Sequence, residues 1–325
     1  MLPFSIAKAW TTKEAISAGG RGERYIAGGT TLIDLMREEV ERPERLVDIN
    51  NLPLGGIRVE HDVLVIGALA RMAEVAAHPD VRRLHPLIAE ALEEAASPQL
   101  RNMASIGGNL MQRVRCPYFR MLDAMCNKRE PGAGCAALAG INGGHAILGT
   151  SDSCVATHPS DLAVALIAFD ATMRVRGPHG ERSFPVTDLY RIPGSTPHLE
   201  HTLRAGELIL DVRVPIRPIA ATGRYLKVRD RSSYEFALVS AAAALQVEGG
   251  IVRAARIACG GVGTRPWRMS AVEAALIGRP ATRPSFEAAA EHSTQGARPL
   301  SGNGFKMALL PRTIIRALEM SGEKA

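Results

Sequence analysis

The sequence predicts an α+β protein in three parts, and three observations carry that prediction. Strands alternate with helices over residues 1–52, an order that is typical of a small parallel sheet. Residues 53–218 contain short alternating strands around tight turns, which indicates a mixed or antiparallel sheet. Residues 219–325 contain two long apolar strands and then helices. With 325 residues, 46% of them hydrophobic, the chain can bury more than one core.

The first part is expected to be a strand–helix–strand–helix–strand unit. Its strands are expected at Phe4–Ala7, Arg24–Ala27 and Leu46–Ile49, and its second helix at Thr31–Val40. Thr11 and Glu14 fit a capping box at the start of the first helix, which Gly19-Gly20 ends. The stretch from Asn50 to Pro53 is the first expected boundary.

The second and third parts are separated by a boundary near Pro215–Thr222. Before it, strands are expected at Gly56–Glu60, Val63–Gly67, Thr172–Arg176, Arg182–Phe184 and Glu207–Val214, and helix over Met72–Ala96. After it, strands are expected at Phe236–Val247 and Ile251–Ala258, and helices at Met269–Leu276 and Gly304–Met320.

Composition excludes few function classes. Lys and Arg number 39 against 33 acids, but they are spread along the chain, which argues against nucleic-acid binding. No run approaches the roughly 20 apolar residues of a membrane span. The opening Met1-Leu2-Pro3-Phe4 lacks a charged leader, so the chain by itself is expected in the cytoplasm. Export together with a signal-bearing partner subunit would place it in the periplasm instead.

Two adjacent-glycine loops are candidate phosphate-binding sites. The first runs from a strand through Gly28-Gly29 into a helix, and the second holds Gly107-Gly108 between Ser105 and Asn109. Glycine lets backbone N–H groups approach a phosphate, and a helix N-terminus adds partial positive charge. The first loop matches neither a Walker loop nor the dinucleotide fingerprint, and each loop alone is also typical of a tight turn. Together they suit a diphosphate gripped from both sides.

Four of the five cysteines fall close together and predict a metal centre. They are Cys116, Cys126, Cys135 and Cys154, spaced Cys-x9-Cys-x8-Cys-x18-Cys, whereas Cys259 lies in an apolar strand and is expected to be a structural thiol. Disulfides are disfavoured without an export signal, and the close cysteine pairs of zinc sites and compact ferredoxins are absent. The neighbouring cations would stabilise thiolates: Arg113, Arg115, Arg120, Lys128 and Arg129.

On spacing alone, three interpretations of these cysteines stay open: an iron–sulfur cluster, a zinc site and unrelated buried thiols. His145 and His158 are candidate substitute ligands, although four cysteines already suffice.

Ordered motifs along the whole chain resemble the FAD-binding subunits of the xanthine dehydrogenase, or molybdenum hydroxylase, family. They are Ala27–Leu32, Ala104–Asn109, Ser160–Leu162, Glu207–Pro215, Tyr225–Arg229, Gly260–Gly263 and Pro266–Arg268. The resemblance implies a FAD-binding domain over residues 1–218, with subdomains 1–52 and 53–218, and a flavoprotein C-terminal domain over 219–325. Residues 112–156, the cysteine segment, are similar to those of periplasmic aldehyde oxidoreductases. The 4-hydroxybenzoyl-CoA reductase FAD subunit is similar too. This implies a 4Fe–4S cluster on the four cysteines.

The resemblance also implies which residues contact FAD. They are Tyr25, Ile26, Ala27, Gly28, Gly29, Thr30, Thr31, Leu32 and Ile33 in the first loop, Ser105, Gly107, Gly108 and Asn109 in the second, Asp161 at the adenosine end, Ile209 on the flavin ring and Lys227 at its edge. Considered alone, Asp161 fits a helix N-cap, Ile209 an ordinary core position and Lys227 a solvated strand lysine.

By the same resemblance, the chain is an electron-transfer subunit without catalytic residues of its own. Substrate, expected to be an aldehyde, would react at a molybdopterin in a large subunit. Electrons would cross two 2Fe–2S clusters of a small subunit, reach FAD here, and leave to an acceptor protein or small molecule. The cluster would be a relay or a structural staple. The alternatives are a subunit of the xanthine or hydroxybenzoyl-CoA type, or a non-catalytic, metal-stapled assembly subunit.

Overall fold

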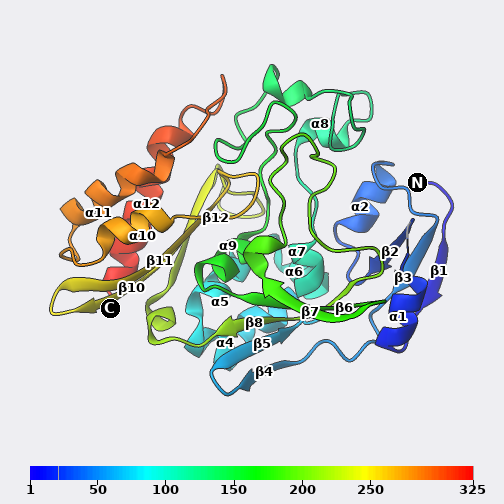
Figure 1. The fold of residues 1–325 in the computed structure, drawn as a ribbon, viewed down its shortest axis with the longest axis horizontal. Helices are drawn as coiled ribbons and strands as arrows, with labels where there is room; N and C mark the ends of the chain where they lie inside the picture. Colours follow the sequence, from blue (N-terminus) through cyan, green and yellow to red (C-terminus); the bar gives the residue numbers. More distant parts are fainter. Residues whose placement is uncertain (21, 325) are drawn as a thin grey trace.

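The computed structural model describes residues 1–20 and 22–324, and it confirms the predicted α+β class (Figure 1). The described strands form three sheets, and helices pack against their faces. The three-stranded sheet lies near the N-terminus, the five-stranded sheet in the middle, and the four-stranded sheet beside the last helices (Figure 1).

The N-terminal sheet is parallel, as the alternation of strands and helices predicts. Its strands are β1 (Ser5–Lys8), β2 (Glu23–Ile26) and β3 (Arg45–Asp48), in the order β1-β3-β2, and its helices are α1 (Thr12–Ala18) and α2 (Leu32–Arg37). The Thr11 hydroxyl caps α1 by accepting from the Glu14 amide at 3.1 Å, while the Glu14 carboxylate accepts from Trp10 at 2.8 Å. The second helix ends earlier than predicted, because Glu39 adopts a φ of 58°.

The five-stranded sheet joins segments that are far apart in the sequence. Its strands are β4 (Ile57–Glu60), β5 (Val63–Gly67), β6 (Thr172–Gly177), β7 (Gly180–Pro185) and β8 (Leu208–Pro215). Their order is β4-β5-β8-β6-β7, and every neighbouring pair is antiparallel. The predicted tight turns at His61-Asp62 and Pro178-His179-Gly180 therefore connect neighbouring strands.

The helical stretch predicted over residues 72–96 is divided into short helices by proline. The helices between β5 and β6 are α3 (Met72–Ala77), α4 (Pro79–Leu84), α5 (Pro86–Glu93), α6 (Pro98–Met103), α7 (Ile106–Leu110), α8 (Pro117–Arg120) and α9 (Asp161–Ala168), and the first three of them fall within residues 72–96. Pro79 and Pro86 each open a new helix, since proline lacks the N–H that would continue the preceding one.

The C-terminal part is an antiparallel sheet with helices on one side. Its elements are β9 (Arg224–Val228), β10 (Val239–Glu248), β11 (Ile251–Gly260), β12 (Trp267–Arg268), α10 (Ser270–Leu276), α11 (Arg283–Ala290) and α12 (Lys306–Gly322). The predicted helices do not include α11, in which Pro284 lies in the first turn, where proline is tolerated.

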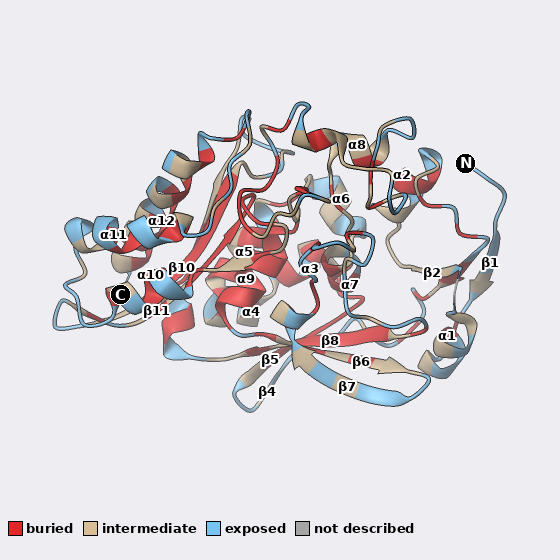
Figure 2. Ribbon diagram, turned by 45° about the horizontal axis from the view of Figure 1, so that its top comes forward, coloured by how far each residue is buried: buried red, intermediate tan, exposed pale blue. Residues whose placement is uncertain are grey.

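The centre of the molecule is the helix α9, all of whose residues are buried (Figure 2). It packs against α5 and β11, so it joins the middle and C-terminal parts in one core. A second core lies between the C-terminal sheet and its helices. Burial of this apolar surface provides most of the stabilisation.

The cysteine segment, residues 112–156, is mostly loop and is held by hydrogen bonds within itself and to the C-terminal part. The Arg129 guanidinium donates to the carbonyls of Tyr118 and Phe119, both at 2.9 Å. On the C-terminal side, the buried Lys306 of α12 donates to His145 O at 2.9 Å and to Gly261 O at 2.6 Å. These contacts satisfy loop carbonyls that have no sheet partner. In residues 1–20 and 22–324, no helix combines the length and apolarity that crossing a membrane requires.

Candidate functional site

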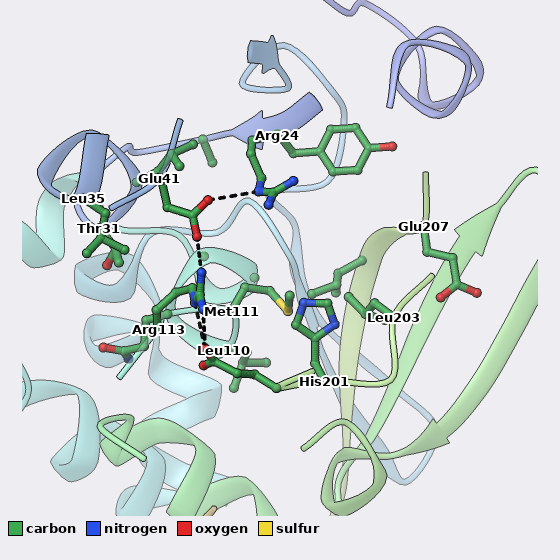
Figure 3. A pocket seen from close by; sticks show the side chains of 18 of the residues that line it. Arg24, Thr31, Leu35, Glu41, Leu110, Met111, Arg113, His201, Leu203 and Glu207 are labelled. Carbon is green, nitrogen blue, oxygen red and sulfur yellow. Dashed lines mark hydrogen bonds and ion pairs between the residues drawn. The ribbon is translucent and has the colours of Figure 1, made fainter. Parts of the chain in front are cut away.

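The two glycine loops lie on the wall of one cavity of about 590 Å³, here called the larger cavity. Figure 3 draws other side chains of this wall, among them Thr31, Glu41 and Arg113. The predicted FAD residues on its wall are Tyr25, Ile26, Ala27, Gly28, Gly29, Thr30, Thr31, Leu32, Ser105, Gly107, Gly108 and Ile209. This volume lies within the usual range for cofactor pockets. The structure therefore brings together two loops that the sequence separates by some eighty residues.

The loops meet through close backbone contact. A Cβ on Gly28 would lie 1.9 Å from the Met103 carbonyl oxygen, so only glycine fits there. The Arg71 guanidinium ties the same region together, donating to Met103 O at 2.6 Å and to Asn50 Oδ1 at 2.8 Å. The Asn50 amide in turn donates to Ala27 O at 3.1 Å. Because Gly28 has no side chain, the first loop can pack directly against the Met103 backbone at the edge of the cavity.

Replacing Gly28 by alanine is expected to lower both stability and FAD retention. The added methyl meets backbone rather than a movable side chain, so the loops must separate, at a cost of about 1–3 kcal/mol. Denaturant unfolding and the flavin-to-protein absorbance ratio measure the two effects. Gly55→Ala is the matched control, because a Cβ there meets nothing within 4 Å. Equal behaviour of the two variants would refute the steric role of Gly28.

Ile33, Asn109, Asp161 and Lys227 are not part of the cavity wall. Ile33 is partly exposed, and Asn109 Oδ1 accepts from the Ser160 hydroxyl at 2.6 Å. The N-cap of α9 is Ser160, whose hydroxyl accepts from the Ala163 amide at 3.0 Å, so the N-cap interpretation of Asp161 is wrong.

Asp161 and Lys227 bind each other instead. The Lys227 ammonium lies 2.9 Å from Asp161 Oδ2, and the Tyr225 hydroxyl donates to Asp161 Oδ1 at 2.6 Å. Burial raises the pKa of Asp161, while the lysine and the hydroxyl oppose that shift. Lys227 also donates to Glu94 O at 3.0 Å, so this pair joins β9 to α9 and to the end of α5. The predicted contacts of both residues with FAD stay predictions.

A chain of charged side chains runs along the larger cavity, and sequence patterns did not reveal it. Arg24 pairs with Glu41 at 3.5 Å, Glu41 pairs with Arg113, and Arg113 pairs with Glu200 at 2.7 Å (Figure 3 draws the first two pairs). Burial lowers the pKa of Arg113, but the two carboxylates outweigh it and raise the pKa above its ordinary value. These residues come from separate segments, so only the fold joins them.

An aromatic and an imidazole close another side of the larger cavity. His158 and Tyr190 meet edge to face, with ring centroids 4.3 Å apart. Burial lowers the pKa of His158 to about 3, so its ring is neutral at physiological pH. The Tyr190 hydroxyl donates to Leu110 O at 3.1 Å.

The four predicted metal ligands line one narrow second cavity, here called the cysteine cavity. Cys116, Cys126, Cys135 and Cys154 all stand on its wall, and none of them is in a disulfide. Cys126 and Cys135 face each other in an isolated antiparallel bridge. By contrast, the fifth cysteine, Cys259, is buried in β11 as expected.

The donor set consists of four cysteine thiols, the ligand type that soft metal ions and iron–sulfur clusters take. Among the residues the structure describes, no three His, Cys, Asp or Glu side chains are grouped closely enough to share one metal ion. Burial raises the pKa of Cys116 to about 11 and also raises the pKa of Cys154. A bound metal would hold such thiols as thiolates.

The structure places neither histidine on the wall of the cysteine cavity. Nε2 of His145 lies 3.2 Å from Cys116 Sγ, a hydrogen-bond distance, while His158 stands on the wall of the larger cavity. His145 therefore contacts one cysteine of the set, whereas His158 belongs to the wall of the larger cavity.

The cysteine segment is also tied to the helix that follows the first glycine loop. Arg115 donates to the Thr31 hydroxyl at 3.0 Å, and Arg120 lies 2.8 Å from Asp34 and 2.7 Å from Glu38. A small apolar core unites Leu35 of α2 with residues around the cysteines. The helix α2 therefore contacts both candidate sites, because it follows the first glycine loop and packs against the cysteine segment.

Comparison with known proteins identifies the family. The family model described as "FAD binding domain in molybdopterin dehydrogenase" matches residues 1–217, and "CO dehydrogenase flavoprotein C-terminal domain" matches residues 224–319. The aldehyde oxidoreductase FAD-binding subunit PaoB of Escherichia coli K12 is 45% identical over 324 residues, 98% of each chain. The carbon monoxide dehydrogenase medium chain of Hydrogenophaga pseudoflava is 27% identical over 92% of this chain and 89% of its own.

A solved structure agrees. Carbon monoxide dehydrogenase from Hydrogenophaga pseudoflava aligns over 100% of both chains with a TM-score of 0.77 and 26% identity. Relatives in this group are subunits of dehydrogenases and oxidoreductases. The chain therefore belongs to the FAD-binding oxidoreductase subunits of the molybdenum hydroxylase family.

Proposed function

We propose that this chain is the FAD- and 4Fe–4S-binding electron-transfer subunit of a molybdenum-dependent aldehyde oxidoreductase. The observation that carries the proposal is that four cysteines line one cavity directly beside the cavity of the glycine loops. The 45% identity to an aldehyde oxidoreductase subunit supports the substrate class. A xanthine or hydroxybenzoyl-CoA type remains the alternative enzyme, and identification of the partner molybdenum subunit distinguishes them.

The residues of the chain would bind and orient the cofactors. Gly28-Gly29 and Gly107-Gly108 would present backbone amides to the pyrophosphate, while Ile209 would pack against the flavin ring. Asp161 and Lys227 already form an ion pair with each other. To contact FAD, one of the two side chains would have to make a further hydrogen bond to the cofactor. FAD and the cluster supply the electron chemistry when bound, and the protein supplies position and electrostatics.

The proposed complex is a heterotrimer with a large molybdopterin subunit and a small 2Fe–2S subunit. Electrons from the 2Fe–2S clusters would pass through FAD to an external acceptor. The two family matches meet between residues 217 and 224, which supports the proposed domain division at residue 218. A structural role of the cluster is the competing interpretation, because the cysteine segment also fastens α2 and α12.

Flavin and iron analysis of the purified complex tests the proposal. The expected result is bound FAD and Mössbauer signals of one 4Fe–4S cluster in addition to the 2Fe–2S clusters of the partner. Flavin without the 4Fe–4S signal would remove the cluster from the proposal. A 4Fe–4S signal without flavin would favour the metal-stapled assembly subunit.

A further inference from the structure

The larger cavity and the cysteine cavity share a wall. Val114, Lys128, Cys154 and Ala156 line both of them. Val114 and Ala156 are small and apolar, and Cys154 belongs to the proposed ligand set. Lys128 is the remaining one, and it is a cation. Groups bound in the two cavities would therefore be separated by a single layer of side chains.

Lys128 is held firmly in this wall. Its side chain is only 8% exposed, its ammonium donates to Pro197 O at 2.9 Å, and it lies 3.5 Å from the Glu200 carboxylate. The lysine belongs to the cysteine segment, whereas Pro197 and Glu200 belong to the loop that lines the larger cavity. The contact thus spans the junction between the two sites.

Glu200 connects Lys128 to the charged chain along the larger cavity. The complete chain is Arg24, Glu41, Arg113, Glu200 and Lys128, and every member stands on the wall of that cavity. Three cations face two carboxylates, which leaves one excess positive charge. Coulomb interactions reach farther in such a partly buried setting than on the surface, because water and salt screen them less.

We propose that Lys128 is a shared electrostatic control element that, together with Glu200, sets the reduction potentials of both the flavin and the cluster. This inference rests on the proposed function. Reduction adds negative charge to either centre, so a cation in the common wall favours both reduced forms. When one electron passes between the centres, one is oxidised and the other is reduced by the same electron. Because the cation favours the reduced form of each centre, it raises both potentials relative to those of the partner subunit's clusters.

The test uses opposite-sign substitutions in the intact complex. Lys128→Gln is expected to lower both potentials and Glu200→Gln to raise both, while Lys128→Arg stays near the wild type. Redox titration followed by electron paramagnetic resonance reports the cluster, and visible absorbance reports the flavin. Arg253→Gln is the control, because it removes one cation from an exposed pair on the β10–β11 hairpin and should move neither potential.

A purely structural role would produce a different pattern. Unmoved potentials, or shifts of the same sign in Lys128→Gln and Glu200→Gln, would overturn the inference. If Lys128→Gln fails to assemble, the sign of the Glu200→Gln shift decides. Iron and flavin contents separate this failure from that of the proposed function: a wild-type complex without the 4Fe–4S signal overturns both, whereas a loaded complex with unmoved potentials overturns only the role of Lys128.

Discussion

Cys126→Ser is expected to remove the 4Fe–4S cluster while leaving most of the FAD in place. A serine hydroxyl does not replace a thiolate that a cluster needs, and the other three thiols cannot complete the ligand set. Cys126 is buried and lines the cysteine cavity but not the larger cavity, so flavin contacts should survive. Iron per chain, Mössbauer spectra and flavin absorbance of the purified complex measure the result.

The matched control for this variant is Cys259→Ser. Cys259 is fully buried in β11, where burial raises the pKa of its thiol, and it lines neither cavity. The control should lose stability yet keep its iron, because only the apolar packing of the C-terminal core is disturbed. Retention of all four cluster irons by Cys126→Ser would contradict the ligand assignment.

Asp161→Ala is expected to destabilise the fold by about 3–5 kcal/mol, because it leaves a buried cation without its partner. The Lys227 side chain is only 1% exposed and that of Asp161 only 7%, so solvent screens little of this interaction. The Tyr225 hydroxyl would lose its acceptor as well. Denaturant unfolding of the variant and the wild type, each within its assembled complex, gives the change.

Flavin retention distinguishes two roles of Asp161. If Asp161 or Lys227 also contacts FAD, flavin occupancy should fall in Asp161→Ala and should not recover when Lys227→Met removes the stranded charge. If the pair acts only in packing, the double variant should regain stability and flavin together. Unchanged flavin occupancy in Asp161→Ala would refute a role in holding FAD.

Local signals in the sequence were sufficient for most elements of the fold. Strand–helix alternation with Thr11 and Gly19-Gly20 as boundaries predicted the parallel sheet, since caps and turns depend on neighbouring residues. Gly249-Gly250 predicted the hairpin between β10 and β11 for the same reason. Errors fell at helix ends and at proline, where α2 ended early and residues 72–96 were divided. At these positions the backbone conformation ends a helix although the apolar pattern of the sequence continues.

The candidate sites could be predicted less completely than the elements of the fold. The sequence by itself determined which residue types were available: two glycine loops, four cysteines and scattered cations. Only the tertiary structure decided that the glycine loops border one cavity, that the cysteines border the next, and that Lys128 stands in their common wall. It also paired Asp161 with Lys227. Such contacts depend on how sheets and helices from distant parts of the chain pack together. The spacing of residues along the sequence does not predict that packing.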